Sequence, residues 1–274
     1  MVLKVLDLFS GIGGFSLGLE RAGMKTTAFC EIDPWCRKVL HKHWPGVLKF
    51  TDIRELRPKQ GDYDLICGGF PCQDISFAGN RKGIINGKRS SLWKEYARLI
   101  NEIRPKYAII ENVEHLRKNG LGVVLNDLAR IGYDAEWAVI TANSIGLPHQ
   151  RKRLFIISYP RSERLNAHIR EKRLLQINEE RESKEIYTEG EQCESKPVEV
   201  RPILSKGSFD LRRDSYPNRF SAVSSVHRVT DGFPGKLDKI RRERIKMLGN
   251  SVVPQIVELM GREIIKNELE IGEK

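Results

Sequence analysis

The sequence has no hydrophobic run long enough to cross a membrane. None of its apolar stretches approaches the ~18 consecutive residues that a spanning helix needs. Lys4 and Asp7 interrupt the apolar start too early for a secretory signal peptide. We therefore expect no membrane segment and a protein that works in the cytoplasm.

Cysteine pairs with the spacing of metal or disulfide sites are also missing. The five cysteines stand at positions 30, 36, 67, 72 and 193, with no CxxC pair and no ligand spacing to histidine. A zinc centre or a disulfide framework is therefore not expected, and the chain fits a reducing compartment. Internal repeats and low-complexity tracts are absent as well.

Positive charge dominates the composition. The chain carries 47 Lys and Arg against 36 Asp and Glu, a net charge of +11. Residues 1–160 contain 24 basic against 16 acidic side chains and residues 201–246 contain 12 against 5, whereas residues 161–200 contain 8 against 10. Such an excess also serves solubility, but two separate basic regions favour a polyanionic partner gripped between them, most commonly a nucleic acid.

Apolar runs and helix signals alternate along residues 1–160. Strands are expected at residues 2–9, 26–32, 63–67, 107–113, 135–142 and 154–159, and helices at 15–21, 34–44, 90–104 and 121–131. This alternation predicts a doubly wound α/β fold with a mostly parallel sheet, closed by a hairpin. The pattern stops at Pro160 and recovers at Met247, where an amphipathic helix follows to about residue 268. We expect one domain from residues 1–160 and 247–274, with residues 161–246 as a small inserted basic region.

A glycine-rich turn ends the predicted strand 63–67. Gly68, Gly69 and Pro71 stop the strand, so Cys72 follows at its carboxyl end, where open α/β sheets place their ligands. A lone cysteine is more often a small buried hydrophobe. The rigid turn and the polar, basic segment that follows favour a reactive thiol instead.

A second glycine-rich loop, from Asp7 to Gly14, joins the first strand to the first helix. Glycines let a ligand approach the backbone, and a helix N-terminus offers free N–H groups; tight strand–helix packing is the alternative. Glu31 follows Gly11 by 20 residues, where an acid can bind both hydroxyls of a ribose or simply be solvated. Together they indicate a nucleoside cofactor, either NAD-like or S-adenosylmethionine. Asp52 is a candidate acceptor for an adenine amino group.

Charged residues mark two further strand ends. Glu111 lies near the end of the predicted strand 107–113, at the same rim as Cys72, and is a candidate general acid unless it is merely solvated. Arg151 and Arg153, two residues apart in an extended segment, face the same way. They either clamp an anion or a carbonyl oxygen, or border the sheet.

In combination these segments resemble the DNA (cytosine-5) methyltransferase family. The family's motifs appear in order: its cofactor loop at residues 7–14, then Glu31-Ile32-Asp33, Asp52-Ile53, Pro71-Cys72-Gln73, Glu111-Asn112-Val113, Gln150-Arg151-Lys152-Arg153 and Gly249-Asn250-Ser251-Val252-Val253-Pro254. The resemblance covers about residues 1–160 and 247–268. It implies a Rossmann-like fold that binds S-adenosyl-L-methionine.

The resemblance also implies an activity, which is methylation of C5 of a flipped cytosine in a specific duplex DNA sequence, in restriction–modification or in phage or host DNA modification. Cys72 would attack C6, Glu111 would bind or protonate N3, Arg153 would bind O2, and Arg151 would hold the nucleophile loop. The implied cofactor-binding residues are Phe9, Gly11, Ile12, Gly13, Gly14, Glu31, Ile32, Asp52, Ile53, Pro71, Leu92, Asn250, Ser251 and Val252.

Double-stranded DNA is the implied partner, bound by a monomer without a metal ion. The expected DNA-binding residues are Gln73, Ser76, Arg81, Lys82, Lys88 and Arg89 after the nucleophile, and Arg212, Arg213, Arg219 and Arg228 in the inserted target-recognition region. Three alternatives remain open. The first is the same chemistry on tRNA, although the Cys-Phe-Thr of that branch is absent. The second is a catalytically silent DNA-binding protein. The third is a nicotinamide dehydrogenase, which the missing GxGxxG spacing disfavours.

Overall fold

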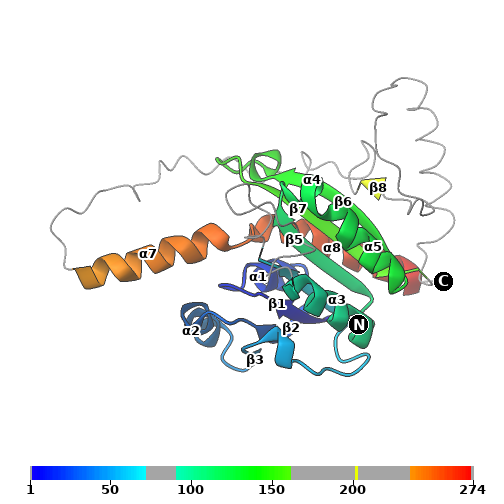
Figure 1. Ribbon diagram of the computed structural model, residues 1–274, viewed down its shortest axis with the longest axis horizontal. Helices are drawn as coiled ribbons and strands as arrows, with labels where there is room; N and C mark the ends of the chain where they lie inside the picture. The colour runs from blue at the N-terminus through cyan, green and yellow to red at the C-terminus, as the bar shows by residue number, and fades with distance from the viewer. Residues whose placement is uncertain (1, 72–90, 162–200, 203–234, 273–274) are drawn as a thin grey trace, which may run out of the picture.

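Five parallel strands form one half of a mixed sheet, and an antiparallel hairpin extends it (Figure 1). The computed structural model describes residues 2–71, 91–161, 201–202 and 235–272. The strand order is β3-β2-β1-β4-β5-β7-β6-β8. The strands are β1 (Lys4–Leu8), β2 (Lys25–Cys30), β3 (Leu48–Phe50), β4 (Leu65–Gly69), β5 (Tyr107–Val113), β6 (Tyr133–Thr141), β7 (Lys152–Pro160) and β8 (Arg201–Pro202). The predicted α/β class and mostly parallel sheet are confirmed.

Helices follow the strands in the expected alternation. They are α1 (Gly14–Arg21), α2 (Pro34–His43), α3 (Ser91–Ile103), α4 (Leu116–Asn119), α5 (Leu121–Arg130), α7 (Gly235–Asn250) and α8 (Pro254–Gly272), with 3-10 turns η1 (Ile53–Glu55) and η2 (Ala142–Ile145). α2 illustrates why they begin where they do: Asp33 accepts hydrogen bonds from the N–H groups of Trp35 and Cys36, and Pro34 occupies the first turn. In the part of the chain that is described, no helix combines the length and hydrophobicity needed to span a bilayer.

Two apolar layers cover the two faces of the sheet. On one face, strand residues such as Leu6 and Ile66 pack with Trp93 and Tyr96 of α3 and with the buried side of α5. On the other face, alternate strand residues pack against α1 and α8. Successive residues of a strand point to opposite faces, so β1 and β4 contribute to both layers.

The C-terminal helix packs against the first helix. α8 packs along α1, and the contact depends on small residues on both sides. A Cβ at Gly18 would lie 2.5 Å from the carbonyl oxygen of Pro254, and one at Gly261 would lie 2.7 Å from the Cβ of Ala22. Residues separated by the whole inserted region therefore share one core.

The sequence pattern missed the shortest elements. β3, η1 and α4 have three or four residues each and were not predicted, because so short a segment shows no hydrophobic period. β2 ends at Cys30, two residues before the expected end. α7 is one continuous helix through residues 246 and 247, and it extends away from the sheet (Figure 1).

Candidate active site

The loop between β1 and α1 has an unusual backbone. Phe9, Gly11 and Gly13 have φ angles of 51°, 55° and 85°, a region that glycine adopts freely and phenylalanine rarely does. Gly14 lies against the C-terminal segment, because a Cβ there would lie 2.6 Å from Ser251 Oγ and 2.9 Å from a methyl of Val252. The predicted glycine loop and the last predicted motif therefore meet.

Asp7 is buried beneath this loop and caps α1 from the strand below. Its Oδ2 accepts hydrogen bonds from the Ser16 N–H at 3.3 Å and the Ser16 hydroxyl at 2.7 Å, which replaces the side-chain cap that Gly13 cannot supply. Burial raises the pKa of Asp7 to about 8. The sequence marks Asp7 as the start of the loop, and an acid within an apolar strand is a signal for this capping role.

Glu31 joins the end of β2 to the glycine loop. One carboxylate oxygen accepts from the Gly11 N–H at 2.6 Å and the other from the Asp33 N–H at 2.8 Å. Arg37 of α2 fixes the following turn by donating to the carbonyls of Glu31 and Ile32 at 3.0 and 2.6 Å. Beside this buried acid the side chain of Ile32 is 62% exposed. An acid with spare lone pairs next to an exposed apolar surface suits a ribose and a base.

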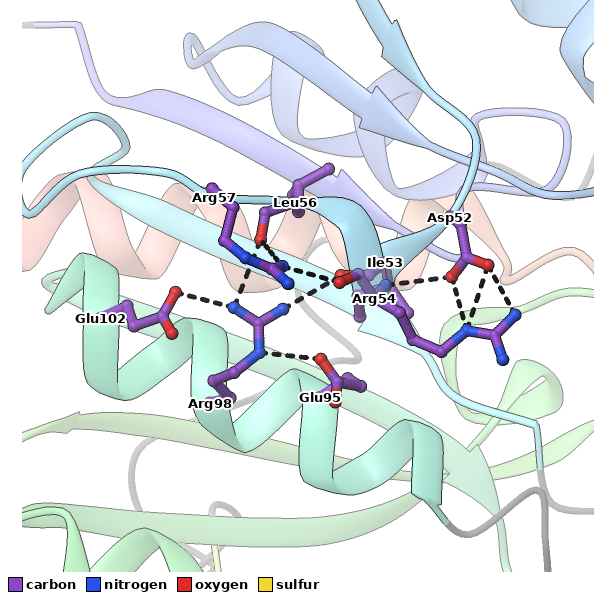
Figure 2. A network of polar contacts seen from close by, with 8 residues as sticks. All are labelled: Asp52, Ile53, Arg54, Leu56, Arg57, Glu95, Arg98 and Glu102. Atoms are coloured by element: carbon purple, nitrogen blue, oxygen red, sulfur yellow. Dashed lines mark hydrogen bonds and ion pairs between the residues drawn. The ribbon is translucent and has the colours of Figure 1, made fainter.

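Asp52 lies in the turn after β3, where its carboxylate is held by its own neighbour. Its oxygens accept from the Arg54 N–H at 3.0 Å and from the Arg54 guanidinium at 2.5–3.1 Å (Figure 2). These hydrogen bonds lower the pKa of Asp52. Ile53 is buried in the core, so only its backbone can face a ligand, and Leu92 at the start of α3 is half-buried beside the same core.

The chain is firmly anchored up to Pro71. Phe70 is buried against Trp93 with ring centroids 5.4 Å apart. The buried side chain of Asn112, on the neighbouring strand β5, donates to the Phe70 carbonyl at 3.1 Å. Cys72 itself lies outside the described residues, so the structure fixes the residues that lead into it.

Glu111 lies at the carboxyl edge of the sheet, opposite Gly69 in the β4–β5 register. A methyl group on Gly69 would collide with Glu111 Oε2. The ion pair from Arg153 Nε to Glu111 Oε1 measures 2.9 Å, and the Glu111 side chain is 12% exposed. Burial raises the pKa of Glu111 to about 7, although Arg153 and Arg151 act to lower it. The carboxyl is therefore poised to gain or lose a proton near neutral pH.

Arg151 connects this edge to the turn between α7 and α8. Its two terminal nitrogens donate to the carbonyls of Gly249 and Ser251 at 2.6 and 2.9 Å. Its Nε is buried without a hydrogen-bond partner among the described residues. Arg151 thus holds the last predicted motif in place, a contact that the sequence analysis did not predict.

Most of the predicted site residues that the structure describes gather at one edge of the sheet. The glycine loop, Glu31, Ser251 and Val252, which were predicted to bind the cofactor, form one side (the cofactor side), and Glu111 with Arg153 forms the other (the base side). Asp7, Arg37 and Asn112 support these residues, and their supporting contacts were not predicted. The predicted residues that lie outside the described ranges are Cys72, Gln73, Ser76, Arg81, Lys82, Lys88, Arg89, Arg212, Arg213, Arg219 and Arg228. Within those ranges no cluster of three possible metal ligands occurs.

Comparison with known proteins identifies the fold and the family. A model of the C-5 cytosine-specific DNA methylase family matches residues 3–219. The chain is 40% identical over 164 residues to the Type II methyltransferase M2.BsuMI of Bacillus subtilis, covering 57% of this chain and 42% of that protein. It is 32% identical over 252 residues to M.Sau3AI of Staphylococcus aureus, covering 84% and 57%.

Among solved structures, the fold is similar to a protein of an E. coli prophage described as a DNA modification methyltransferase. The TM-score is 0.50 and the identity 28%, over 60% of this chain and 48% of that one. The chain spans about half the length of the curated relatives it matches. Because the family model matches most of the sequence, the chain belongs to the C-5 cytosine-specific DNA methylase family.

Proposed function

We propose that this chain is a DNA (cytosine-5) methyltransferase that uses S-adenosyl-L-methionine and a covalent Cys72 intermediate. The observation that carries the proposal is the Glu111 carboxyl, almost buried, paired with Arg153 at 2.9 Å and with its pKa raised to about 7. It lies beside the strand that leads to Cys72 and on the same edge of the sheet as the glycine loop.

The residues of the cofactor side suit a nucleoside with a sulfonium side chain. Glu31 would accept from the ribose hydroxyls, and Ile32, exposed beside it, would cover a face of the adenine. Asp52 would accept from the adenine amino group, while the loop at Gly11 to Gly14 and the Ser251–Val252 turn would enclose the remainder. When bound, the cofactor supplies an electrophilic methyl group.

On the base side, the residues would activate a carbon that is otherwise a poor nucleophile. The Cys72 thiolate would add to C6 of cytosine, while Glu111 donates a proton to N3 and Arg153 donates to O2. This makes C5 enamine-like, so that it can take up the methyl group. Loss of the C5 proton, departure of the thiolate from C6 and return of the N3 proton to Glu111 would then restore the aromatic ring and free both residues for another cycle.

The target base must leave the DNA helix for these contacts to form. Extrusion of a paired base costs a few kcal/mol, and contacts between basic side chains and phosphates would offset part of it. We assign this role to the basic residues of segments 73–89 and 201–246, the second as part of the target-recognition region. The relatives are Type II methyltransferases, which supports a role in DNA modification with duplex DNA as the partner.

Transfer of tritiated methyl groups from S-adenosylmethionine to duplex DNA and to tRNA tests the proposal. We expect label in DNA, and bisulfite sequencing of DNA from expressing cells should give the modified context. Cys72→Ser should abolish transfer and also abolish the covalent adduct that wild type forms with DNA bearing 5-fluorocytosine. Label in tRNA alone, or full activity of Cys72→Ser, would overturn the proposal.

A further inference from the structure

Arg98 of α3 binds the backbone on both sides of η1 (Figure 2). One terminal nitrogen donates to the carbonyl of Ile53 at 3.1 Å, and the other donates to the carbonyl of Leu56 at 3.3 Å. The planar guanidinium carries its donors in a fixed fork, so two carbonyls held by one arginine are also held relative to each other.

Two acids on α3 fix the orientation of this guanidinium. Arg98 donates to Glu95 at 2.8 Å and to Glu102 at 2.7 Å, residues one turn before and one turn after it. Its side chain is 26% exposed, so it is fixed in a largely covered position. α3 therefore presents a rigid clamp to η1.

The Arg98 clamp connects the very short turn η1 to a part of the chain that is distant in sequence. Within the described residues, the other hydrogen bonds that residues 52–57 make near η1 stay inside the turn. They run from Arg54 to Asp52 and from Arg57 to the carbonyls of Arg54 and Leu56. Asp52 is the N-cap of η1 and accepts from the Arg54 N–H. The direction of the Asp52 carboxylate therefore depends on the backbone that Arg98 holds.

We propose that Arg98 is a positioning residue that orients the Asp52 turn toward the amino group of the cofactor's adenine. This inference rests on the proposed function, which assigns adenine to Asp52. The Arg54–Asp52 pair does not prevent it. The Arg54 side chain is 63% exposed, where an ion pair adds little, and a carboxylate has lone pairs for further donors.

Binding of two ligands that differ only in that amino group tests the proposal. The full-length protein is titrated by calorimetry with S-adenosylhomocysteine and with S-inosylhomocysteine, which carries a carbonyl oxygen in place of the amino group. Since hydrogen bonds to charged groups are strong, wild type should prefer the adenosyl ligand by about tenfold or more. Arg98→Met keeps the alkyl stem and loses the donors, so the preference should fall to about twofold. Arg98→Lys keeps the charge but lacks the fork and should also lose most of the preference.

Arg104→Met is the matched control. Arg104 follows α3 and also donates to a backbone carbonyl of another part of the fold, that of Ile131 at 2.5 Å, but this carbonyl belongs to the C-cap of α5 and not to η1. The Arg104→Met variant should have a lower melting temperature and the same ligand preference as wild type. A preference retained in Arg98→Met or Arg98→Lys would overturn the inference, and so would an equal loss of affinity for both ligands. A wild type that binds neither ligand would instead overturn the proposed cofactor.

Discussion

Protonation of Glu111 is expected to shape how the methylation rate depends on pH. Burial raises the pKa of this carboxyl from 4.5 to about 7 in the structure. Relative to a carboxyl in water, the shift favours the neutral form by about 3 kcal/mol, with the opposing effect of Arg153 already included. A general acid must hold its proton, so the fraction of competent enzyme falls as pH rises through about 7.

Cys72 has the opposite requirement, because its thiolate is the proposed nucleophile. With the ordinary thiol pKa of about 8.5, the thiolate fraction increases tenfold per pH unit up to about 8.5. In wild type the two trends cancel between pH 7 and about pH 8.5, so kcat/KM should rise below pH 7, stay roughly level to about pH 8.5 and fall above it. Between pH 6 and pH 8 the two titrations give a rise of about eightfold.

Glu111→Gln separates the two trends. Glutamine cannot lose a proton in this range, so the rise should continue to about pH 8.5 and amount to about eightyfold between pH 6 and pH 8. The absolute rate should fall by about 10²–10⁴-fold, because an amide is a weak proton donor. Tritiated methyl transfer at saturating cofactor and limiting DNA, from pH 5.5 to pH 9, measures kcat/KM. A wild-type profile that keeps rising through pH 7 as steeply as the variant's would refute Glu111 as the acid.

Three further substitutions test the site from other directions. Asp7→Asn should flatten the pH dependence of stability. Burial raises the pKa of Asp7 to about 8, so the folded wild type loses stability as pH rises from about 4 to about 8. The free energies of unfolding measured in urea at pH 5 and pH 8 should therefore differ less in the variant, and Glu111 accounts for the difference that remains. An unchanged difference would contradict a neutral buried Asp7. Gly69→Ala should slow methyl transfer about a hundredfold, because the added methyl group displaces Glu111. Gly122→Ala is the control and should not slow it, because there is open space around Gly122. Equal rates in the two variants would contradict the contact between Gly69 and Glu111. Arg151→Met should weaken binding of S-adenosylhomocysteine about tenfold in calorimetry, because the turn between α7 and α8 loses two charge-assisted hydrogen bonds; unchanged affinity would show that this turn does not need them.

The sequence predicted the long, regular elements well because their signals are local. The strand expected at residues 107–113 is β5 with those bounds, since the apolar run at residues 107–110 indicates a buried strand. The helix expected from residue 34 begins there, because Asp33 and Pro34 form a recognisable cap. Glycine turns after β1 and β4 likewise marked the carboxyl edge where the site lies.

Contacts between distant segments could not be read from spacing. Arg98 meets η1 across 45 residues and Arg151 meets Gly249 across 98, and no local period or cap encodes such pairs. Asn112 was noted only as part of a motif, whereas its hydrogen bond to Phe70 depends on the β4–β5 register. Tertiary packing decides these roles.

The pair Arg151 and Arg153 explains how the two sides of the site are joined. The sequence predicted that they face the same way; Arg153 lies in β7 and Arg151 directly precedes it, and they bind different partners. Arg153 pairs with Glu111 of β5, and Arg151 holds the carbonyls of Gly249 and Ser251 beside the glycine loop. Both contacts depend on the antiparallel register of β5 with β7. A slip of one residue would turn both side chains to the other face. The pairing of β5 with β7 therefore fixes both the ion pair of Arg153 with Glu111 and the hydrogen bonds of Arg151 to Gly249 and Ser251.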